Sequence, residues 1–495
     1  MKHTIYRILP VMLTGLLSCT LLTGCFKDHS TDPDRPVTEI TTTEELREIY
    51  TSEEGRILEI PAPKLTLNGP SKEVKYSWEV DYKEVSTSQV LKYRCPKPGV
   101  YALRLLITNG ETTIAQRAKI NVQYRFRQGL YFLGQEDKQA TIGFVEPSQP
   151  DKEVDYDVLT LNNPAGTFVG TPHDLAFVTN VAYQVKGFIL ACGTTLYNFE
   201  PDQMIMTKTL PLKSEITSIE GTWADSKGRF FYNGRFGDFN IKTLEANNSD
   251  LNTFGTPLGT SRDKLSLAPV TVSWLTDKND PKKVDGYLAY DNGTERMVAR
   301  FSQLGSRKTM SWFPDETKGY SLTHMVLTGD RLRVALFLKS KSDETIKHLL
   351  INPGTHNVAK AKRVPEDVLL SKEVPAAAHL NASSVMTSAP TRNLVFYSGA
   401  DGSGIYAYNT MSQGNFPTTP LITLSKDEVV VDMVVDKDDR FLYIALNSRS
   451  GSTSSIRQID LTKLTKDSNP VVHEWKDLRL PITAIALRED YPIDN

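Results

Sequence analysis

A weak repeat of short apolar segments constrains the fold of this 495-residue chain more than any other feature. Seven such segments begin between Asp174 and Ile482, spaced about 51 residues apart. They are residues 174–178, 216–219, 270–274, 322–326, 384–386, 430–435 and 482–487. Because a four-stranded blade of a β-propeller takes roughly 40 to 50 residues, the spacing predicts a propeller.

Further apolar strands follow the first strand of each repeat unit, usually after a Gly, Asp or Asn turn. The second strands are predicted at residues 187–191, 228–232, 286–290, 331–336, 393–397 and 440–445, and third strands at 195–199, 404–409 and 455–460. Consecutive antiparallel strands of this kind are what a propeller blade contains.

The two ends of the repeat region complement each other. The seventh segment, residues 482–487, has only eight residues after it, and residues 129–133 open the region without a first strand before them. We expect residues 482–487 to form one sheet with residues 129–133, 140–145 and 156–161. The ring would then close on a composite blade without an exposed sheet edge. This predicts seven blades over residues 125–495, with six or eight as the alternatives.

Residues 36–124 alternate apolar and polar positions, a period of two that indicates half-buried strands. Strands are predicted at 57–60, 75–80, 90–93 and 101–107, separated by Pro and Asn-Gly turns. About seven strands in about 85 residues are typical of a β-sandwich. The chain is therefore expected to be all-β, with an N-terminal sandwich followed by the propeller.

The N-terminus reads as a targeting segment. Lys2 and Arg7 precede an apolar run that leads to Leu22-Thr-Gly-Cys25, which resembles the bacterial lipobox. Residues 1–24 are thus predicted to be a lipoprotein signal peptide, with Cys25 acylated after cleavage and residues 25–35 forming a flexible tether. The alternatives are an ordinary secretory signal or a transmembrane anchor, but the run contains Pro10 and falls short of the roughly 18 residues a spanning helix needs.

The charge of the chain argues against nucleic-acid binding. There are 57 Lys and Arg residues against 59 Asp and Glu residues, and the net charge is about −4 once the signal peptide is removed. Of the four cysteines, Cys95 and Cys192 would remain as thiols in different domains, so neither a disulfide framework nor a metal-binding spacing is predicted.

Motifs of common enzyme classes are missing from the sequence. It contains no His-Glu-x-x-His, Gly-x-Ser-x-Gly, Walker or Cys-x-x-Cys motif. Residues 261–264 fit Ser-x-x-Lys, of which about two matches are expected by chance. The charged segments 277–280 and 436–440 are interpreted as turns, because they lack the spacing of a calcium loop. No catalytic residue, metal or cofactor is predicted.

Candidate ligand-binding residues come from two groups. Trp312, Phe313 and Phe236 lie in segments expected to be loops, where flat aromatic rings stack on sugars; the alternative is packing between blades. His173, His324 and His379 lie in or near first strands, which line the centre of a propeller. They would suit an acid–base or metal cluster only if their separate blades bring them together. Of these, Trp312, Phe313, Phe236, His173 and His324 are the predicted ligand-binding residues.

Several of these motifs together resemble a known family. Tyr76-Ser-Trp-Glu-Val80, followed by an apolar strand after Pro98-Gly99, is similar to the PKD-type immunoglobulin-like module. With the lipobox, the tether and Gly-Leu-Tyr-Phe-Leu at 129–133, the chain resembles the PKD-like family of Bacteroidetes-type lipoproteins. The resemblance implies an outer-membrane protein, with Lys27-Asp28 as an export signal to the cell surface. It also implies a role beside SusC/SusD-like, TonB-dependent transporters of glycans or peptides.

These observations lead to three hypotheses. The first is a non-catalytic surface lipoprotein that binds a glycan, a peptide or a transporter partner, anchored to the membrane through Cys25. The second is a propeller hydrolase or lyase acting on a glycan or peptide at the same surface. The third is a structural scaffold of a transporter complex. Periplasmic exposure is the alternative to surface display.

Overall fold

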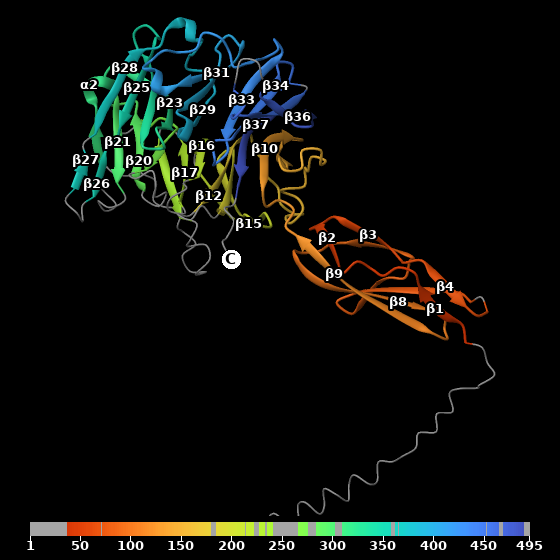
Figure 1. Cartoon of the computed structure of the whole chain (residues 1–495). Coiled ribbons are helices and arrows are strands. Elements are labelled where there is room, and N and C mark those ends of the chain that lie inside the picture. Colours follow the sequence, from red (N-terminus) through yellow and green to blue (C-terminus); the bar gives the residue numbers. More distant parts are fainter. Residues whose placement is uncertain are drawn as a thin grey trace, which may run out of the picture. The chain divides into compact units, whose positions relative to one another are not determined.

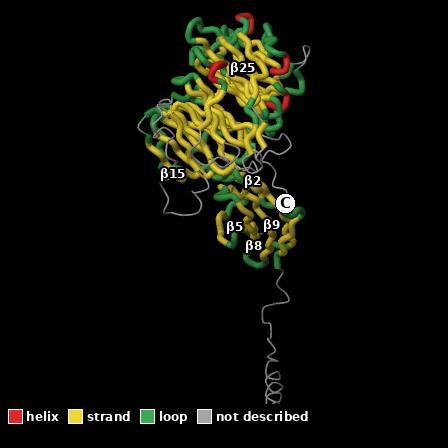
Figure 2. The backbone as a smooth tube through the Cα atoms, turned by 90° about the vertical axis from the view of Figure 1, so that its left-hand side faces the viewer, coloured by secondary structure: helices red, strands yellow, loops and turns green. Residues whose placement is uncertain are grey.

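The computed structural model of the chain is built almost entirely of strands (Figures 1 and 2). It describes residues 37–70, 72–179, 185–212, 214–221, 227–232, 235–240, 266–275, 284–301, 309–357, 362–364, 366–451, 453–464 and 469–489. The signal peptide, the tether and residues 261–264 and 277–280 lie outside this set. Within it, no helix has the length and apolar character needed to cross a membrane. The chain divides into two compact units, with the boundary between Arg125 and Phe126.

The described part of the first unit contains nine strands, two more than the sequence pattern predicts. They are β1 (Glu39–Thr42), β2 (Ile49–Glu53), β3 (Ile57–Pro61), β4 (Leu65–Asn68), β5 (Lys75–Val80), β6 (Lys83–Ser86), β7 (Val90–Arg94), β8 (Gly99–Thr108) and β9 (Thr113–Gln123). A five-stranded sheet has the order β2-β9-β8-β5-β6, while β1 pairs with β4 and β3 pairs with β7. All pairings are antiparallel except β2 with β9.

Trp78 of β5 lies at the centre of the first unit. Its side chain is completely buried, and its indole Nε1 donates a hydrogen bond to the Ser88 carbonyl oxygen at 2.9 Å. Inward-facing residues of β1, β3, β5, β7, β8 and β9 pack around it into one core. The alternation along β8, where Leu103, Leu105 and Ile107 are buried, follows from the pleat, which sends successive side chains to opposite faces.

The second unit is a propeller-like series of small antiparallel sheets. In its described part, seven sheets follow one another along the chain, accompanied by a hairpin of β26 (Thr355–Asn357) and β27 (Lys362–Val364). The first three sheets are β37 (Ile482–Arg488), β10 (Gly129–Glu136) and β11 (Gln139–Val145); β12 (Pro172–Thr179), β13 (Val185–Cys192), β14 (Thr195–Glu200) and β15 (Ile205–Pro211); and β16 (Ile216–Gly221), β17 (Lys227–Tyr232) and β18 (Arg235–Asn240). The next two are β19 (Val272–Leu275), β20 (Val284–Asp291), β21 (Arg296–Phe301) and β22 (Thr309–Trp312); and β23 (Tyr320–Thr328), β24 (Arg333–Ser340), β25 (Ile346–Asn352) and β28 (Asp367–Glu373). The last two are β29 (Met386–Ala389), β30 (Leu394–Ser398), β31 (Gly404–Asn409) and β32 (Ile422–Thr423); and β33 (Glu428–Val435), β34 (Phe441–Ser448), β35 (Ser454–Asp460) and β36 (Val471–Leu478).

The C-terminal strand joins the start of the second unit. β37 pairs antiparallel with β10, from Gly129 opposite Arg488 to Gly134 opposite Ile482, as the two incomplete ends predicted (Figure 1). One expected member of this sheet is missing, because residues 156–161 form turns and no strand. Val158 and Leu159 are nevertheless buried, in the core shared with β12 to β14. Their apolar pattern therefore reflected packing in the core between the β10–β11 sheet and the β12–β15 sheet.

The first strands of successive sheets lie next to one another. Contacts connect β37 with β12, β12 with β16, β19 with β23, β23 with β29, β29 with β33, and β33 with β37. Between β16 and β19 the link consists of hydrogen bonds, from Ser218 Oγ to the Pro269 carbonyl oxygen at 2.8 Å and from the Thr271 amide to Glu220. The order in which the strands follow along the chain is thus also their order in space.

A buried histidine between two of these sheets makes stability depend on pH. His348 of β25 is completely buried, lies parallel to the Phe337 ring at 5.0 Å, and has its Nδ1 3.3 Å from the Tyr408 hydroxyl. Burial lowers the pKa of His348 to about 4. Because the unfolded chain binds this proton near pH 6.5, the folded state loses stability as the pH falls from about 6.5 to about 4.

The pKa of His348 is about 6.5 in the unfolded chain and about 4 in the folded protein. We expect this difference to cost about 3 kcal/mol in the free energy of unfolding when the pH falls below both values. Urea unfolding of wild type and His348→Phe at pH 7.5 and pH 4.5 measures it. The variant should lose less stability on acidification than wild type, because its ring does not titrate. An equal loss in both proteins would contradict the assignment.

Candidate functional site

Two aspartates, each in the first strand of its sheet, form hydrogen bonds to the first strand of the next sheet. Asp174 of β12 accepts hydrogen bonds from the Leu175 amide at 2.8 Å and from the Ile219 amide of β16 at 2.9 Å. Asp432 of β33 repeats the arrangement with the Met433 amide and with the Ile485 amide of β37, both at 2.8 Å. The strand register shifts just before each aspartate, which turns its carboxylate toward the next sheet.

Both carboxyl groups have a pKa well above the ordinary value for aspartate. Burial, with a smaller contribution from the negative charge of Asp432, raises the pKa of Asp174 to about 7. Burial raises the pKa of Asp432 to about 6. Both oxygens of each carboxylate already accept an amide hydrogen bond, an arrangement that holds the sheets together. We therefore assign the two aspartates a structural role in linking neighbouring sheets.

The three candidate histidines contact three different residues. His324 of β23 has its Nε2 2.6 Å from the Ser384 carbonyl oxygen, and burial lowers its pKa. His173 Nε2 lies 4.0 Å from Glu215 Oε1. His379 Nδ1 lies 3.0 Å from Asp401 Oδ2. Within the described residues, His173 Nε2 is buried without a hydrogen-bond partner, whereas His324 contributes to the contact between two sheets.

The candidate aromatic residues occupy different positions from those predicted. Trp312 is the last residue of β22, where it lies opposite Met297, and Phe236 belongs to β18, opposite Phe231. The expectation that these two lie in loops is therefore wrong, and their side chains lie outside what the structure describes. Phe313 follows β22 with a φ of 51° and packs, half-buried, against the core of the adjoining sheets. It is part of the packing between sheets, which was the alternative interpretation.

The charged segment 436–440 forms the turn between β33 and β34. Asp436 Oδ1 accepts hydrogen bonds from the amides of Arg440 and Phe441. Asp439 Oδ2 accepts from the amide and hydroxyl of Thr391, both at 2.6 Å. These carboxylates are therefore engaged in shaping a turn, in agreement with the interpretation from sequence.

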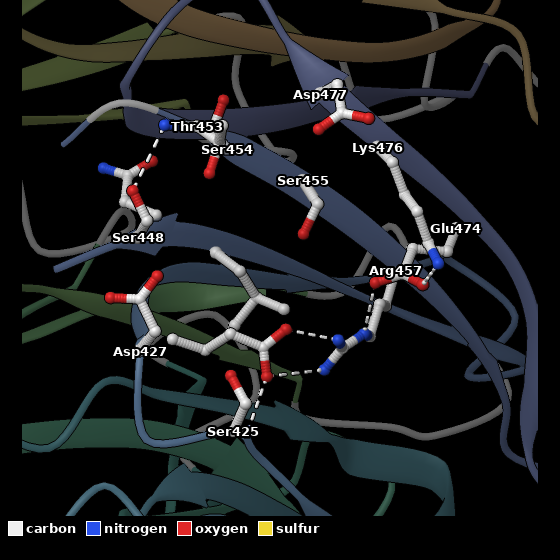
Figure 3. Close-up of a pocket in the computed structure, with 13 residues that line it drawn as sticks. Ser425, Asp427, Ser448, Thr453, Ser454, Ser455, Arg457, Glu474, Lys476 and Asp477 are labelled. Carbon is white, nitrogen blue, oxygen red and sulfur yellow. Dashed lines mark hydrogen bonds and ion pairs between the residues drawn. The ribbon is translucent and has the colours of Figure 1, made fainter. Parts of the chain in front are cut away.

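An open polar pocket lies at one end of the β33–β36 sheet (Figure 3). Its volume is about 310 Å³. Thirteen residues line it: Ser425, Asp427, Glu428, Leu446, Asn447, Ser448, Thr453, Ser454, Ser455, Arg457, Glu474, Lys476 and Asp477. Only Leu446 is apolar among them. The pocket thus offers hydroxyl, amide and charged groups in place of an apolar wall.

A three-residue ion cluster forms one wall of this pocket. Arg457 of β35 donates to Glu428 of β33 through both terminal nitrogens, and its Nε donates to Glu474 Oε1 of β36 at 2.7 Å (Figure 3). Lys476 Nζ lies 3.1 Å from the second Glu474 oxygen, and the Ser425 amide donates to Glu428 at 2.8 Å. The opposing charges hold the three side chains in place.

Two acidic residues border the pocket without belonging to this cluster. Asp427 and Asp477 are both exposed, and Figure 3 shows them on opposite sides of Ser455. Asp477 has a φ of 50°, a left-handed conformation that Asp tolerates better than most residues. Carboxylates and hydroxyls placed around an open cavity are suited to hydrogen-bonding a ligand with many hydroxyl groups.

Sequence reasoning missed this pocket. Residues 455–460 were predicted only as a third strand, and no motif marks Arg457, Glu428 and Glu474. One signal was present, since the charged residues at 428, 474 and 476 occur within strands whose other residues are largely apolar. A charge inside such a strand suggests a partner across the sheet.

Comparisons with known proteins add structural likenesses of low identity. No protein-family model and no curated protein matches the chain. Among solved structures, a quinoprotein alcohol dehydrogenase-like protein from Bacteroides thetaiotaomicron is similar over 92% of this chain and 99% of its own, with 14% identity and a TM-score of 0.44.

The β-propeller domain of Cps50 (Swd1) from Myceliophteria thermophila is similar over 67% of this chain and 96% of its own, with 10% identity and a TM-score of 0.41. A protein of unknown function from Desulfotomaculum acetoxidans is similar over 73% and 99%, with 11% identity and a TM-score of 0.44. The propeller-like architecture follows from the strand pairing itself.

Proposed function

We propose that this protein is a lipid-anchored outer-membrane lipoprotein that faces the cell exterior and binds a glycan for a TonB-dependent uptake system, without catalysing a reaction. The lipobox-like Leu22–Cys25 segment and the family resemblance support the location. The observation that carries the binding role is the open polar pocket of Figure 3. Its exposed carboxylates and serines suit the hydroxyl groups of a sugar, whereas a peptide with apolar side chains would find only Leu446.

The proposal includes the finer architecture. We infer that the seven sheets of the second unit are the blades of one closed propeller, and that the first unit is an immunoglobulin-like module of PKD type. In this arrangement the first unit is a spacer between the anchor at Cys25 and the binding surface. The pairing of β37 with β10 and the contacts between innermost strands support the closed ring.

Binding at the pocket is tested with the double variant Asp427→Asn/Asp477→Asn. Both side chains keep their size, and Asn tolerates the positive φ of Asp477. A glycan array identifies an oligosaccharide ligand, and calorimetry then measures its affinity. We expect at least a tenfold loss in the double variant and no change in Asp367→Asn, an exposed control on β28. Unchanged affinity in the double variant would place glycan binding elsewhere, and an array without any bound glycan would overturn the proposed role.

The anchor is tested by Cys25→Ala. Because acylation requires the Cys25 thiol, the variant should leave the membrane fraction completely, while wild type partitions into detergent. Proteinase added to intact cells should digest the wild-type protein if it faces the exterior. Detergent partitioning by the variant would refute lipidation, and complete protection from proteinase until the outer membrane is permeabilised would place the protein in the periplasm.

A second candidate function, a hydrolase or lyase, is favoured by the pair of His379 and Asp401. A carboxylate at Nδ1 leaves the other ring nitrogen of a histidine to act as a base. The His379 ring also stacks on Tyr406 with the ring centres 5.6 Å apart, and its side chain is 38% exposed. Cleavage of polysaccharides or peptides that disappears in His379→Ala but persists in His173→Ala would establish this activity.

A further inference from the structure

The strand β2 leaves one side of its backbone open at the edge of the five-stranded sheet. β2 pairs only with β9, in parallel, and in such a ladder alternate residues bond to the neighbour. The Glu48 carbonyl accepts from the Lys119 amide at 2.9 Å, and the Glu54 amide donates to Gln123 at 3.0 Å. Even-numbered residues therefore face β9. The amides and carbonyls of Ile49 and Thr51 point the other way, where nothing in the described part of the chain pairs with them.

A cavity of about 650 Å³ runs along this open edge. Residues 44–47 and 49–51 line it on one side, and residues 58, 59 and 61–63, from β3 onward, line it on the other. The Ile49 side chain is 50% exposed. The groove thus combines unpaired backbone groups with the exposed apolar side chains of Ile49 and Pro61, and both features suit a site for an added strand.

The charges around the groove favour a positively charged partner. Glu44, Glu45 and Glu59 contribute three negative charges to its lining, against one positive charge from Arg47. Glu59 forms an ion pair with Lys92 at 2.8 Å, in which both side chains are more than half exposed. Exposed pairs of this kind contribute little and exchange partners readily. A segment with Lys or Arg residues therefore complements the groove.

We propose that this groove binds an extended basic segment of a partner protein, which adds to the sheet as a strand beside β2 (Figure 1). Backbone hydrogen bonds with Ile49 and Thr51 supply affinity for any extended chain. Apolar side chains of the added strand pack on Ile49 and Pro61, and its cationic side chains pair with Glu44 and Glu45. This inference is independent of the proposed glycan binding, because the groove and the pocket of Figure 3 lie in different units.

The test uses the full-length protein in a non-ionic detergent and a fluorescein-labelled ten-residue peptide of alternating valine and lysine. Fluorescence anisotropy measures binding, and a peptide of alternating valine and glutamate is the control ligand. Thr51→Pro should weaken binding of the lysine peptide at least tenfold, because proline removes an outward amide and is tolerated at an open edge. Thr51→Ala keeps that amide and should bind within twofold of wild type.

The double charge reversal Glu44→Lys/Glu45→Lys is the second variant. It should also weaken binding of the lysine peptide at least tenfold at low salt. If Thr51→Pro fails to fold, this double variant provides the test of the proposal. Equal binding of both peptides, or unchanged binding by the double variant, would overturn the proposal. So would a dimer of the wild-type protein that Thr51→Pro converts to monomer, since a second copy would then occupy the edge.

Discussion

Deleting residues 482–495 is expected to unfold the second unit or lower its melting temperature steeply. The deletion removes β37, whose Ile482 and Ile485 side chains are 3% and 6% exposed, together with the half-buried Leu487. Burying three such side chains is worth roughly 5 kcal/mol or more, which is comparable with the entire stability of a typical domain. The deletion also leaves β10 with one partner strand instead of two.

Removal of residues 490–495 alone is the matched control, because β37 ends at Arg488. The shorter deletion should leave the melting temperature of the purified protein unchanged, whereas the longer one should yield aggregates or a transition far below wild type. Calorimetry on both proteins distinguishes the two. A folded protein that melts normally without β37 would show that the C-terminal strand is dispensable, and would remove the argument for a closed seven-bladed ring.

The second large effect is expected at Asp202, whose partner Arg488 carries a charge into the interior. The Arg488 side chain is 1% exposed, and its Nη2 lies 2.5 Å from Asp202 Oδ1. Its Nη1 donates to the Pro201 carbonyl oxygen at 2.5 Å. Asp202→Ala leaves a buried charge that carbonyl oxygens solvate but do not neutralise. We therefore expect a loss of about 3 to 5 kcal/mol in the free energy of unfolding, although Asp202 itself is partly exposed.

A double-mutant cycle tests this assignment. Arg488→Met removes the charge and keeps an apolar side chain of similar length, so Asp202→Ala should cost much less in that background than in wild type. Asp367→Ala, which removes an exposed carboxylate on β28, should change stability by less than about 0.5 kcal/mol. Equal costs of Asp202→Ala in both backgrounds would show that the ion pair does not stabilise the fold. Urea unfolding provides the measurement.

The positions of most strands were predictable because alternation is a local property. β5 lies where the pattern placed it, at residues 75–80, and β12 and β33 contain the predicted segments 174–178 and 430–435. The pleat imposes a period of two on any strand with one buried face, so this signal persists without a tertiary structure. The pairing of β37 with β10 was predictable for a different reason, since two incomplete ends of one repeat array are natural partners.

The errors occurred where apolar residues serve contacts other than strand pairing. Residues 156–161 have the composition of a strand but form turns, and their buried side chains pack in the core of the next sheet. Trp312 and Phe236 were expected in loops, whereas they lie in β22 and β18, which pair with β21 and β17. In both cases the surroundings decided the conformation, which local propensity cannot indicate.

The sequence by itself determined the all-β class, the repeat and the ends that pair, because these depend on periodic patterns that single strands carry. Only the tertiary structure decided the chemistry of the surface. Arg457 lies 29 residues from Glu428 and 17 residues from Glu474, and the three meet because β33 to β36 align in one sheet. The open edge of β2 likewise depends on which strand is absent beside it. Such sites arise from register and sheet order, which long-range pairing sets and no local pattern encodes.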